Sequence, residues 1–423
     1  MTMKFITLDE ESFRKYEEES PYRSFTQTPE IAKLREQNGW TAYYLGVEDG
    51  GKLKAATMLI AKPTFLGKST FFAPGGPLLD LEDTTLTNFF FKKLKSYLKS
   101  HNGYVLHIDP NYELIERTRD GAIKEGGFNH QKAINNLKNL GFTKLKIDST
   151  PRYQFALSLD NRTPDQLLAD MKRNTRNHIR KAEKMGVKTR ELKREELSIF
   201  KKITESTSVR RHFTDKPLSY YEQMYDLFHD RGEVMFIVAE APVDAGEGVV
   251  AESEGVRSAP VAGVAPDARG GRPKESSEER ASSFFRDDDG STTSVDGPAG
   301  RAPKIGNDAM APLSVAMFIL HGDEVIYLFS GSDEKYMKEY NAQYLIQWHM
   351  IKHAATHGFK TYNFYGINGL PDRDSKDYGI YDFKKGFTSE STGRVIELIG
   401  DYELPISPFF CHLHRLLSAL KKH

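Results

Sequence analysis

Short apolar runs separated by turn residues divide the early part of the chain into a unit of mixed α/β type. Apolar residues that alternate or run together over a few positions are typical of strands, and apolar residues at helical spacing are typical of helices. The turn Asp49-Gly50-Gly51 separates the first two strands. The predicted order is a strand at Thr41–Val47, a strand at Ala55–Ala61, a short strand at Ser69–Phe72, a helix at Thr84–Leu98 and a strand at Tyr104–Ile108.

The later part of the chain shows the same order of elements. Its helix carries Leu345, Trp348, Ile351 and Ala355 at roughly helical spacing, and Gly358 follows as the expected C′ residue. The predicted order is a strand at Val234–Ala239, a strand at Leu313–Leu320, a strand at Val325–Phe329, a helix at Gln343–His357 and a strand at Thr361–Tyr365. We therefore predict two copies of one mixed α/β unit; two unrelated α/β domains are the alternative.

A compositionally foreign segment interrupts the second copy between its first two strands. Residues 241–312 contain no Leu, and residues 241–308 carry 13 acidic and 8 basic side chains among frequent Ala, Gly, Pro and Ser. Such a composition cannot bury enough apolar surface to offset the entropy of ordering, so we predict disorder. The position corresponds to the turn at Asp49-Gly50-Gly51 in the first copy. A hairpin tip tolerates an insertion because closing a longer loop costs little.

Composition narrows the functional class. The formal net charge of the 423 residues is zero, so a polyanionic partner would have to be met by local patches. The single cysteine, Cys411, excludes an intrachain disulfide and a cysteine-cluster metal site, and we expect it to be a core residue. No histidine spacing supports a metal site, and the N-terminal residues lack the apolar stretch of a signal peptide. No apolar run is long enough to span a bilayer, and we expect a cytoplasmic protein.

Five fragments, taken in order, resemble the Fem family of peptidoglycan aminoacyltransferases, and their order and spacing match over nearly the whole chain outside the foreign segment. They are Ser24-Phe25-Thr26-Gln27-Thr28-Pro29-Glu30, the basic helix Met171–Val187, Tyr327-Leu328-Phe329-Ser330-Gly331-Ser332, Tyr362-Asn363-Phe364-Tyr365-Gly366-Ile367 and Phe383-Lys384-Lys385-Gly386-Phe387.

The resemblance implies two tandem GNAT-like acyltransferase units that use no acetyl-CoA and no other cofactor. It implies aminoacyl-tRNA as donor and the stem peptide of lipid II or of its soluble UDP-muropeptide precursor as acceptor. Many family members carry a coiled-coil arm where the foreign segment lies. Heptads of Leu with Lys and Glu are absent there, so either a linker replaces the arm or the segment comes from a shifted reading frame. An uninterrupted frame confirmed by peptide mass mapping would exclude the frameshift.

The implied reaction is aminolysis of an ester, which needs a proton acceptor for the amine and a group that stabilises the tetrahedral oxyanion. No Ser-His-Asp or Cys-His signature is visible, which favours direct attack by the acceptor amine. By the resemblance, Lys384 stabilises the transition state, Phe383 shapes the pocket, and Asp109 is the general base or positions the amine. The alternatives are a solvated surface lysine for Lys384 and a turn cap for Asp109, which ends a strand just before Pro110. We expect Lys384, Asp109 and Tyr220 to face one cavity between the two halves.

The resemblance also assigns binding residues for the diphosphate and sugar of the precursor. The matching positions are Lys33, Lys216, Tyr220, Tyr327 and Phe329. Family members can have Arg at the position of Lys216, and Lys keeps the charge without bidentate phosphate binding. Phe329 stands where a Tyr is often found, so one hydroxyl contact is missing. The alternatives are a solvated helix residue for Lys33 and core packing for the tyrosines.

The densest basic patch lies on the predicted helix at Met171–Val187. Arg173, Arg176, Arg180 and Lys184 fall near one helical face. This stripe suits the phosphates of a tRNA backbone or anionic lipid headgroups, and a solvated inter-domain helix is the alternative.

The predicted organisation is a first domain over 1–150, on which a C-terminal helix at 408–422 packs back, and a second domain over 151–240 and 309–400. The insertion spans 241–308. Two other functions remain open from the residues: an acyl-CoA-dependent N-acyltransferase, and a non-catalytic protein that binds RNA or a membrane surface through the basic helix. No pyrophosphate-binding loop of the acyl-CoA type is visible. The sequence does not determine which amino acid is transferred, which acceptor position is used, or the oligomeric state.

Overall fold

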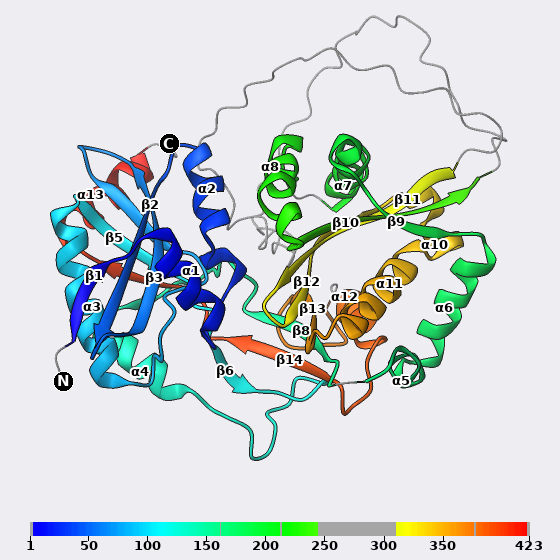
Figure 1. Cartoon of the computed structure of the whole chain (residues 1–423), viewed down its shortest axis with the longest axis horizontal. Coiled ribbons are helices and arrows are strands. Elements are labelled where there is room, and N and C mark those ends of the chain that lie inside the picture. Colours follow the sequence, from blue (N-terminus) through cyan, green and yellow to red (C-terminus); the bar gives the residue numbers. More distant parts are fainter. Residues whose placement is uncertain (1–2, 161, 212–213, 244–309, 376–377, 421–423) are drawn as a thin grey trace, which may run out of the picture.

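Two twisted sheets stand side by side, each covered by helices, in the computed structural model of the chain (Figure 1). The structure describes residues 3–160, 162–211, 214–243, 310–375 and 378–420. The first sheet has the strand order β1-β2-β3-β4-β5-β15-β7. Its strands are β1 (Lys4–Thr7), β2 (Thr41–Asp49), β3 (Lys52–Pro63), β4 (Ser69–Ala73), β5 (Gly103–Ile108), β15 (Tyr402–Pro405) and β7 (Thr143–Lys144).

The second sheet has the order β6-β14-β8-β13-β12-β11-β10-β9. Its strands are β6 (Glu113–Glu116), β14 (Gly393–Leu398), β8 (Tyr153–Ser158), β13 (Thr361–Ile367), β12 (Glu324–Ser332), β11 (Met310–His321), β10 (Val234–Pro242) and β9 (Lys188–Glu191).

Helices cover both sheets. Those of the first half are α1 (Glu10–Glu19), α2 (Pro29–Gln37), α3 (Thr84–Ser100), α4 (Gln131–Asn139) and α13 (Pro408–Leu420). Those of the second half are α5 (Pro164–Asp170), α6 (Arg173–Lys184), α7 (Leu197–Arg211), α8 (Leu218–Phe228), α10 (Glu334–Tyr340), α11 (Ala342–Thr356) and α12 (Tyr378–Lys385). Every strand and helix predicted for the two copies is present, with ends that shift by a few residues.

The predicted repeat is confirmed by strand pairing as well as by order. In the first half β2, β3 and β4 pair antiparallel in sequence, α3 follows, and β5 returns parallel to β4. In the second half β10, β11 and β12 pair antiparallel, α11 follows, and β13 returns parallel to β12. The same crossover in both halves leaves a helix packed on each sheet, which is the arrangement of a mixed α/β unit.

The insertion separates β10 from β11 at the hairpin tip that matches the β2–β3 turn. In that turn Gly50 and Gly51 adopt φ values of +60° and +77°, as a tight hairpin turn requires. In the second half, Ala241 and Pro242 still belong to β10 and pair with Ala311 and Met310. The predicted start of the insertion at residue 241 is therefore wrong, because the ladder continues to Pro242. The predicted disorder concerns residues that otherwise lie outside the described part of the chain.

The two halves exchange strands. β6 lies early in the chain but pairs with β14 of the second sheet, and β15 lies late but pairs with β5 and β7 of the first. α13 follows β15 and packs on β5, where Cys411 Sγ donates a hydrogen bond to the carbonyl of Tyr104 at 3.2 Å. Because β6 crosses over, residues 1–150 do not coincide with the first sheet.

One buried apolar cluster joins the halves. Phe13 and Ile31 from α1 and α2 belong to the same cluster as Phe200, Met224 and Ile326 from the second half. Burying such a surface is the main favourable term in holding packed elements together, so we treat the halves as one body.

Candidate functional site

A cavity of about 390 Å³ in the second half collects most of the residues predicted to act on substrate. It lies among α7, β12, the end of β13, α11 and α12. Five predicted residues line it: Lys216, Tyr327, Phe329, Phe383 and Lys384. We call it the transfer cavity. They come from three separate segments, the loop between α7 and α8, strand β12 and helix α12, and the fold brings them to one cavity.

Lys384 is a buried lysine at the last turn of α12, and its side chain is only 6% exposed. Its Nζ donates to the carbonyl of Gly366 at 2.5 Å and to the carbonyl of Tyr365 at 3.4 Å. An ammonium carries three N–H donors, and these two carbonyls fix its position at the cavity wall. The alternative reading of Lys384 as a solvated surface lysine is wrong.

Tyr365 creates this anchor through an unusual backbone conformation. Its φ is +62°, which is rare for a non-glycine residue and costs free energy. The pairing of β13 with β8 is interrupted between Asn363 and Gly366, and the Tyr365 N–H donates to Asn363 Oδ1 at 2.7 Å. The bend turns the carbonyls of Tyr365 and Gly366 toward Lys384. No local sequence signal singles out Tyr365 beyond its place in the fragment that resembles the family.

Aromatic rings form the dry side of the transfer cavity. Phe383 packs edge-to-face on Tyr344 at 4.9 Å and on Phe387 at 5.3 Å between ring centroids. Tyr327 donates to Ser330 Oγ at 2.5 Å and accepts from Gln343 Nε2 at 2.7 Å. Apolar walls strengthen the interaction of a fixed ammonium with a developing negative charge, because little water screens it.

Tyr220 lies behind the cavity wall rather than on it. The Lys216 ammonium sits 5.6 Å from the Tyr220 ring, and Phe329 packs edge-to-face on that ring at 6.2 Å. Burial raises the pKa of Tyr220 well above its ordinary value, so the phenol stays neutral. The ring supports Lys216 and Phe329 from beneath, and we assign it support rather than direct substrate contact.

Two arginines that sequence reasoning missed add positive charge to this cavity. Arg210 and Arg211, at the end of α7, line it together with Lys216 and Lys384. Among the described residues of the lining, Asp215 is the one acidic residue; it accepts from Lys201 Nζ at 2.8 Å and from Tyr221 at 2.6 Å, so its charge is compensated. The cavity is therefore electropositive and suited to an anion. The adjacent arginines six residues before Lys216 were the available signal.

Asp109 lines a second cavity, and the prediction of one shared cavity is wrong. This cavity, of about 530 Å³, lies between the two halves, and we call it the interdomain cavity. Asp109 accepts from the Gly75 N–H at 2.8 Å and from Thr150 Oγ1 at 2.7 Å. Burial raises the pKa of Asp109 well above its usual range, and the neighbouring Asp401 acts in the same direction. Tyr365 lines both cavities and stands between Asp109 and Lys384.

The interdomain cavity is also lined by the carboxyl of Glu324 and by two stacked ring pairs. Burial raises the pKa of Glu324 to about 7. Tyr22 stacks on Tyr112 at 5.2 Å, and Phe128 stacks on His130 at 4.8 Å between centroids. Sequence reasoning missed all of these residues because they come from segments that only the packing of the two halves brings together.

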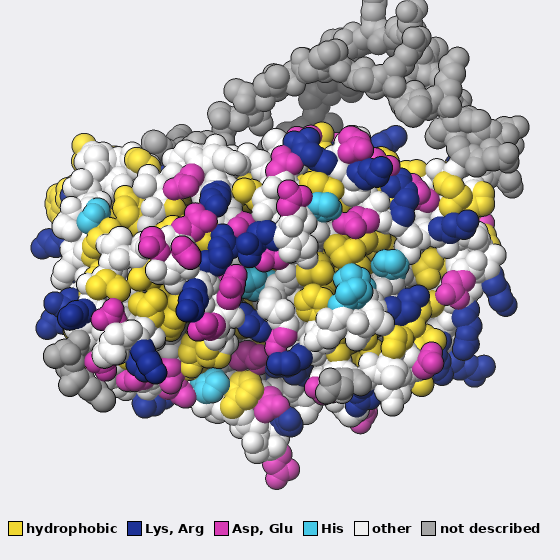
Figure 2. Space-filling view, in the orientation of Figure 1, with side chains coloured by type: hydrophobic (Ala, Val, Ile, Leu, Met, Phe, Trp, Pro, Cys, Tyr) yellow, Lys and Arg dark blue, Asp and Glu magenta, His cyan; other side chains and the backbone are white. Residues whose placement is uncertain are grey.

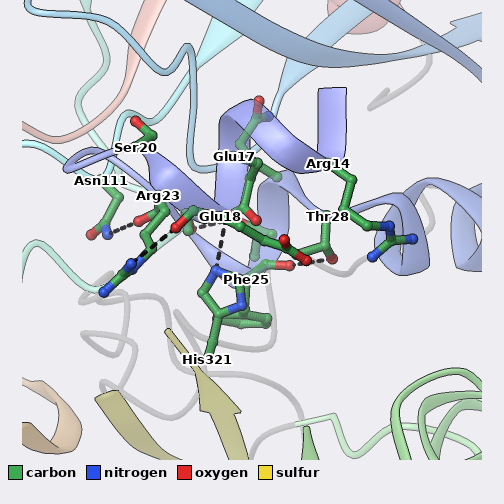
Figure 3. A network of polar contacts seen from close by, with 12 residues as sticks. Arg14, Glu17, Glu18, Ser20, Arg23, Phe25, Thr28, Asn111 and His321 are labelled. Atoms are coloured by element: carbon green, nitrogen blue, oxygen red, sulfur yellow. Dashed lines mark hydrogen bonds and ion pairs between the residues drawn. The ribbon is translucent and has the colours of Figure 1, made fainter. Parts of the chain in front are cut away.

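Polar contacts hold the two halves together at the edge of this cavity, as Figure 3 shows for His321 and the α1 region. His321 Nε2 and Glu17 Oε1 lie 2.8 Å apart, and Arg23 donates to Asp323 at 2.5 Å. Asn111 Nδ2 donates to the Arg23 carbonyl at 2.9 Å. The contacts fix the β11–β12 turn against the first half.

Lys33 lies outside both cavities. It is on α2, its side chain is 45% exposed, and its Nζ pairs with Glu10 at 2.8 Å. The position of Lys33 therefore fits the alternative, a solvated helix residue. It does not lie in the cavity where Lys216 could bind the diphosphate.

The basic patch on α6 contains only part of the predicted stripe. Arg173, Arg180 and Lys184 are exposed, and Lys and Arg side chains gather over the edge of the molecule where α6 lies (Figure 2). Arg176 differs, because its guanidinium donates to the carbonyls of Ala169 and Met171 at 2.7 and 2.6 Å, at the end of α5. Arg176 therefore caps the C-terminal end of α5, because the carbonyls of the last helical turn need hydrogen-bond donors.

The described residues contain neither a membrane-spanning helix nor a cluster of metal ligands. None of the helices they form has the length and apolar character to cross a bilayer. No group of three or more His, Cys, Asp or Glu side chains among them is arranged to hold a metal ion.

The chain is similar to known proteins over nearly its whole length. The chain is 28% identical over 427 residues to the aminoacyltransferase FemA of Staphylococcus aureus, with 99% of each chain covered. Its structure superposes on the crystal structure of FemX with a TM-score of 0.68 at 19% identity, covering 95% of this chain and 97% of the other. A tandem GNAT protein from the clavulanic acid biosynthesis pathway aligns with a TM-score of 0.47 at 11% identity.

The predicted resemblance is confirmed, and so is the mixed α/β fold class with two repeated units. The model of the FemAB family matches residues 8–419, nearly the whole chain, and the protein therefore belongs to the FemAB family.

Proposed function

We propose that this chain moves an amino acid from aminoacyl-tRNA to the stem peptide of a peptidoglycan precursor, and that the bond is made at Lys384. The aminoacyltransferase activity is that of the family to which the chain belongs. The observation that carries the site assignment is the buried Lys384 ammonium, which two carbonyls at the bend of β13 hold at the wall of an electropositive cavity.

The transfer cavity suits the acceptor. Its cations, Arg210, Arg211 and Lys216, match the diphosphate of a lipid-linked or UDP-linked muropeptide, because phosphate rewards clustered positive charge. The hydroxyl of Tyr327 and the amide of Gln343 offer hydrogen bonds to a sugar or peptide. An extended stem peptide would then run along the cavity toward Lys384.

The interdomain cavity suits the aminoacyl end of the donor. The stacked pairs Tyr22–Tyr112 and Phe128–His130 offer ring faces to the terminal adenine, since unpaired bases bind RNA-binding proteins by stacking. Glu324 offers a carboxyl to the α-amino group of the aminoacyl ester. Exposed cations of α6 would contact the tRNA backbone farther out, with a salt dependence typical of phosphate contacts.

The chemistry then needs one tetrahedral intermediate. The neutral acceptor amine attacks the ester carbonyl, so that a C–N bond forms and the carbonyl oxygen becomes an oxyanion beside Lys384. Collapse breaks the C–O bond to the ribose, and the proton lost by the amine reaches the departing ribose oxygen. A single charged donor placed at the oxyanion lowers the activation barrier by about 2–4 kcal/mol. Asp109 is the candidate for positioning the amine or accepting its proton. It lines the interdomain cavity, and Tyr365 lines both this cavity and the transfer cavity.

The test is a transfer assay with purified full-length chain, a panel of aminoacyl-tRNAs, and lipid II or UDP-muropeptide. We expect an acceptor heavier by one aminoacyl residue in mass spectrometry. Lys384→Met should lower kcat about 100- to 1,000-fold, because the oxyanion loses its cation.

Lys385→Met is the matched control for this assay. Lys385 is the next residue, but its ammonium pairs with Asp120 outside the transfer cavity, so activity should remain near that of the unchanged protein. Thermal unfolding must show that both variants are folded, since the Tyr365 and Gly366 carbonyls lose a donor in Lys384→Met. Failure of every aminoacyl-tRNA to yield product would refute the function. Equal activity of Lys384→Met and the unchanged chain would refute the site.

A further inference from the structure

The carboxyl of Asp401 is buried beside that of Asp109, where β5 and β15 meet. β15 pairs antiparallel with β5, and the pairing reaches Tyr402 opposite Ile108. Asp401 precedes Tyr402 and Asp109 follows Ile108, so the same register places the two aspartates opposite each other. Asp401 is 5% exposed and Asp109 is 7% exposed. Like charges at opposite positions repel, and burial leaves little water to screen them.

One short segment donates hydrogen bonds to both carboxyls. Ser149 donates to Asp401 Oδ2 through its N–H at 2.7 Å and also through its hydroxyl. The next residue, Thr150, donates from Oγ1 to Asp109 Oδ2 at 2.7 Å. The Gly75 N–H donates to Asp109 Oδ1 at 2.8 Å. Both oxygens of Asp109 therefore accept a hydrogen bond, which favours the ionised form of this carboxyl.

Asp401 differs because one of its oxygens lacks a donor. Both hydrogen bonds from Ser149 reach Oδ2, and Oδ1 is buried without a hydrogen-bond partner in the described part of the chain. A buried carboxylate oxygen without a donor costs free energy, and a proton on that oxygen removes the charge that makes the cost large. Of the two carboxyls, Asp401 is therefore the better place for a proton.

The charged groups around Asp401 leave its carboxyl without a cation of its own. The ammonium of Lys144 acts on it, but Lys144 Nζ donates to Asp148 Oδ1 at 2.9 Å and to the Ile399 carbonyl at 2.7 Å. Asp148 adds negative charge and accepts from the Asp401 N–H at 2.9 Å. Burial, together with the charges of both aspartates of the pair, raises the pKa of the Tyr365 phenol, which stays neutral. Burial likewise raises the pKa of Asp401 to about 7, although its hydrogen bonds oppose the shift.

We propose that Asp401 is a positioning residue for the transfer reaction, because it holds the proton of the buried aspartate pair and so keeps Asp109 ionised. This inference rests on the proposed function, in which Asp109 accepts the proton of the attacking amine. As the C–N bond forms, the amine nitrogen loses its proton to the Asp109 carboxylate. As the C–O bond to the ribose breaks, that proton passes from Asp109 to the ribose oxygen. Asp401 keeps its own proton throughout, so no second negative charge stands beside Asp109.

The first test needs no substrate. Infrared difference spectroscopy of the full-length chain with isotope-labelled aspartate detects protonated aspartates separately from Glu324. We expect the band of a protonated carboxyl, which disappears as pH rises through about 7. Asp401→Asn should remove this band. Asp109→Asn should keep it and move its midpoint to lower pH by about one unit or more, because the neighbouring negative charge is gone.

The second test is the transfer assay as a function of pH. Ionised Asp401 makes Asp109 hold more tightly the proton that it must return to the ribose oxygen. The ratio of kcat in Asp401→Asn to kcat in the unchanged chain should therefore rise about tenfold between about pH 6 and pH 9. Asp109→Asn should lower kcat about 100-fold or more at every pH, because the proton acceptor is lost.

The matched control is Asp170→Asn on α5. It neutralises an aspartate whose charge Arg162 already compensates at 2.5 Å, so it should change neither the infrared band nor the pH profile. Thermal unfolding must show that the three Asn variants are folded. The infrared titration of the unchanged chain does not depend on any variant.

Several results would overturn the proposal. Absence of the band in the unchanged chain would show that neither aspartate holds a proton. A band that survives Asp401→Asn and is lost in Asp109→Asn would place the proton on Asp109. A kcat ratio that stays level with pH would show that Asp401 only supports the fold. If Asp109→Asn transfers as fast as the unchanged chain while the band behaves as expected, the proton assignment stands, but the role of Asp109 in the transfer fails, and with it the positioning role.

Discussion

At the scale of single residues, the reactive geometry depends on Tyr365 as much as on Lys384. The positive φ of Tyr365 aims two carbonyls at the Lys384 ammonium, and its side chain lines both cavities. Burial raises the pKa of the Tyr365 phenol, and the nearby Asp109 adds to this effect, so the ring stays neutral between the two cavities. We therefore expect Tyr365 to help position the donor and the acceptor relative to each other.

Substitutions at Tyr365 separate its backbone role from its side-chain role. Tyr365→Gly relieves the strain and keeps the bend, but it removes the ring; we expect a folded protein whose kcat falls about 10- to 100-fold with a smaller change in KM, because positioning is lost. Tyr365→Phe keeps the ring, so activity should stay within a few-fold of the unchanged chain. Steady-state kinetics with aminoacyl-tRNA varied at fixed acceptor measures both. Full activity in Tyr365→Gly would show that the ring positions nothing.

At the scale of elements, α6 packs on the protein with one face and exposes cations on the other. Thr175, Ile179 and Ala182 are buried beneath it, Arg180 and Lys184 are exposed, and Arg176 reaches back to the end of α5. Helical spacing predicted the basic face, but it does not tell which of the cations is already engaged by neighbouring carbonyls.

Substitutions of the exposed cations of α6 should therefore change tRNA binding without changing stability. Arg180→Glu with Lys184→Glu should weaken tRNA binding and lower the salt slope by about two, as expected when two phosphate contacts are lost, with no change in melting temperature. Filter binding across a range of salt concentrations measures this effect. Lys95→Glu with Lys99→Glu, the same reversal on exposed positions of α3, is the control and should leave tRNA binding unchanged.

Arg176→Ala should act on stability instead. The Ala169 and Met171 carbonyls lose their donor, and we expect the free energy of unfolding to fall by about 1–3 kcal/mol while exposed phosphate contacts remain. Urea unfolding measures it. An Arg176→Ala protein of unchanged stability but weaker tRNA binding would place Arg176 in the binding stripe after all.

At the scale of the whole molecule, the two halves meet across a cavity with ionisable groups whose pKa values are raised. Burial raises the pKa of Glu324 to about 7. Burial acts to lower the pKa of His321, but the hydrogen bond to Glu17 together with the negative charges of Glu17 and Glu233 outweighs it, and the pKa ends above its usual value. Both residues lie at the β11–β12 turn that contacts the first half.

These shifts predict that the chain loses stability as pH rises. Between the usual glutamate pKa and about 7, folded Glu324 keeps a proton that the unfolded chain has released, so the free energy of unfolding falls across that window and is level above it. The contribution of His321 is present below its usual pKa and is lost as pH rises through the raised value. Melting temperatures from pH 5 to 8 should fall, and Glu324→Gln should make the profile flatter. An identical profile in Glu324→Gln would contradict the shift.

The sequence by itself determined the order of strands and helices, the repeat, the family and the place of the insertion. These features follow from local properties: which residues alternate, which recur at helical spacing, and which turn residues stand between them. Phe383 and Lys384 could be named beforehand because they stand in a fragment that resembles the family, and Lys216 because it matches a family position outside the five fragments.

Only the tertiary structure decided which of these residues meet. It placed Asp109 in the interdomain cavity, left Lys33 paired with Glu10 on the surface, engaged Arg176 at the end of α5, and exchanged β6 and β15 between the halves. Each outcome depends on contacts between segments far apart in the chain, and local patterning carries no information about such partners. The period of hydrophobic residues predicts that a face is buried. Which surface covers that face depends on how the two halves pack.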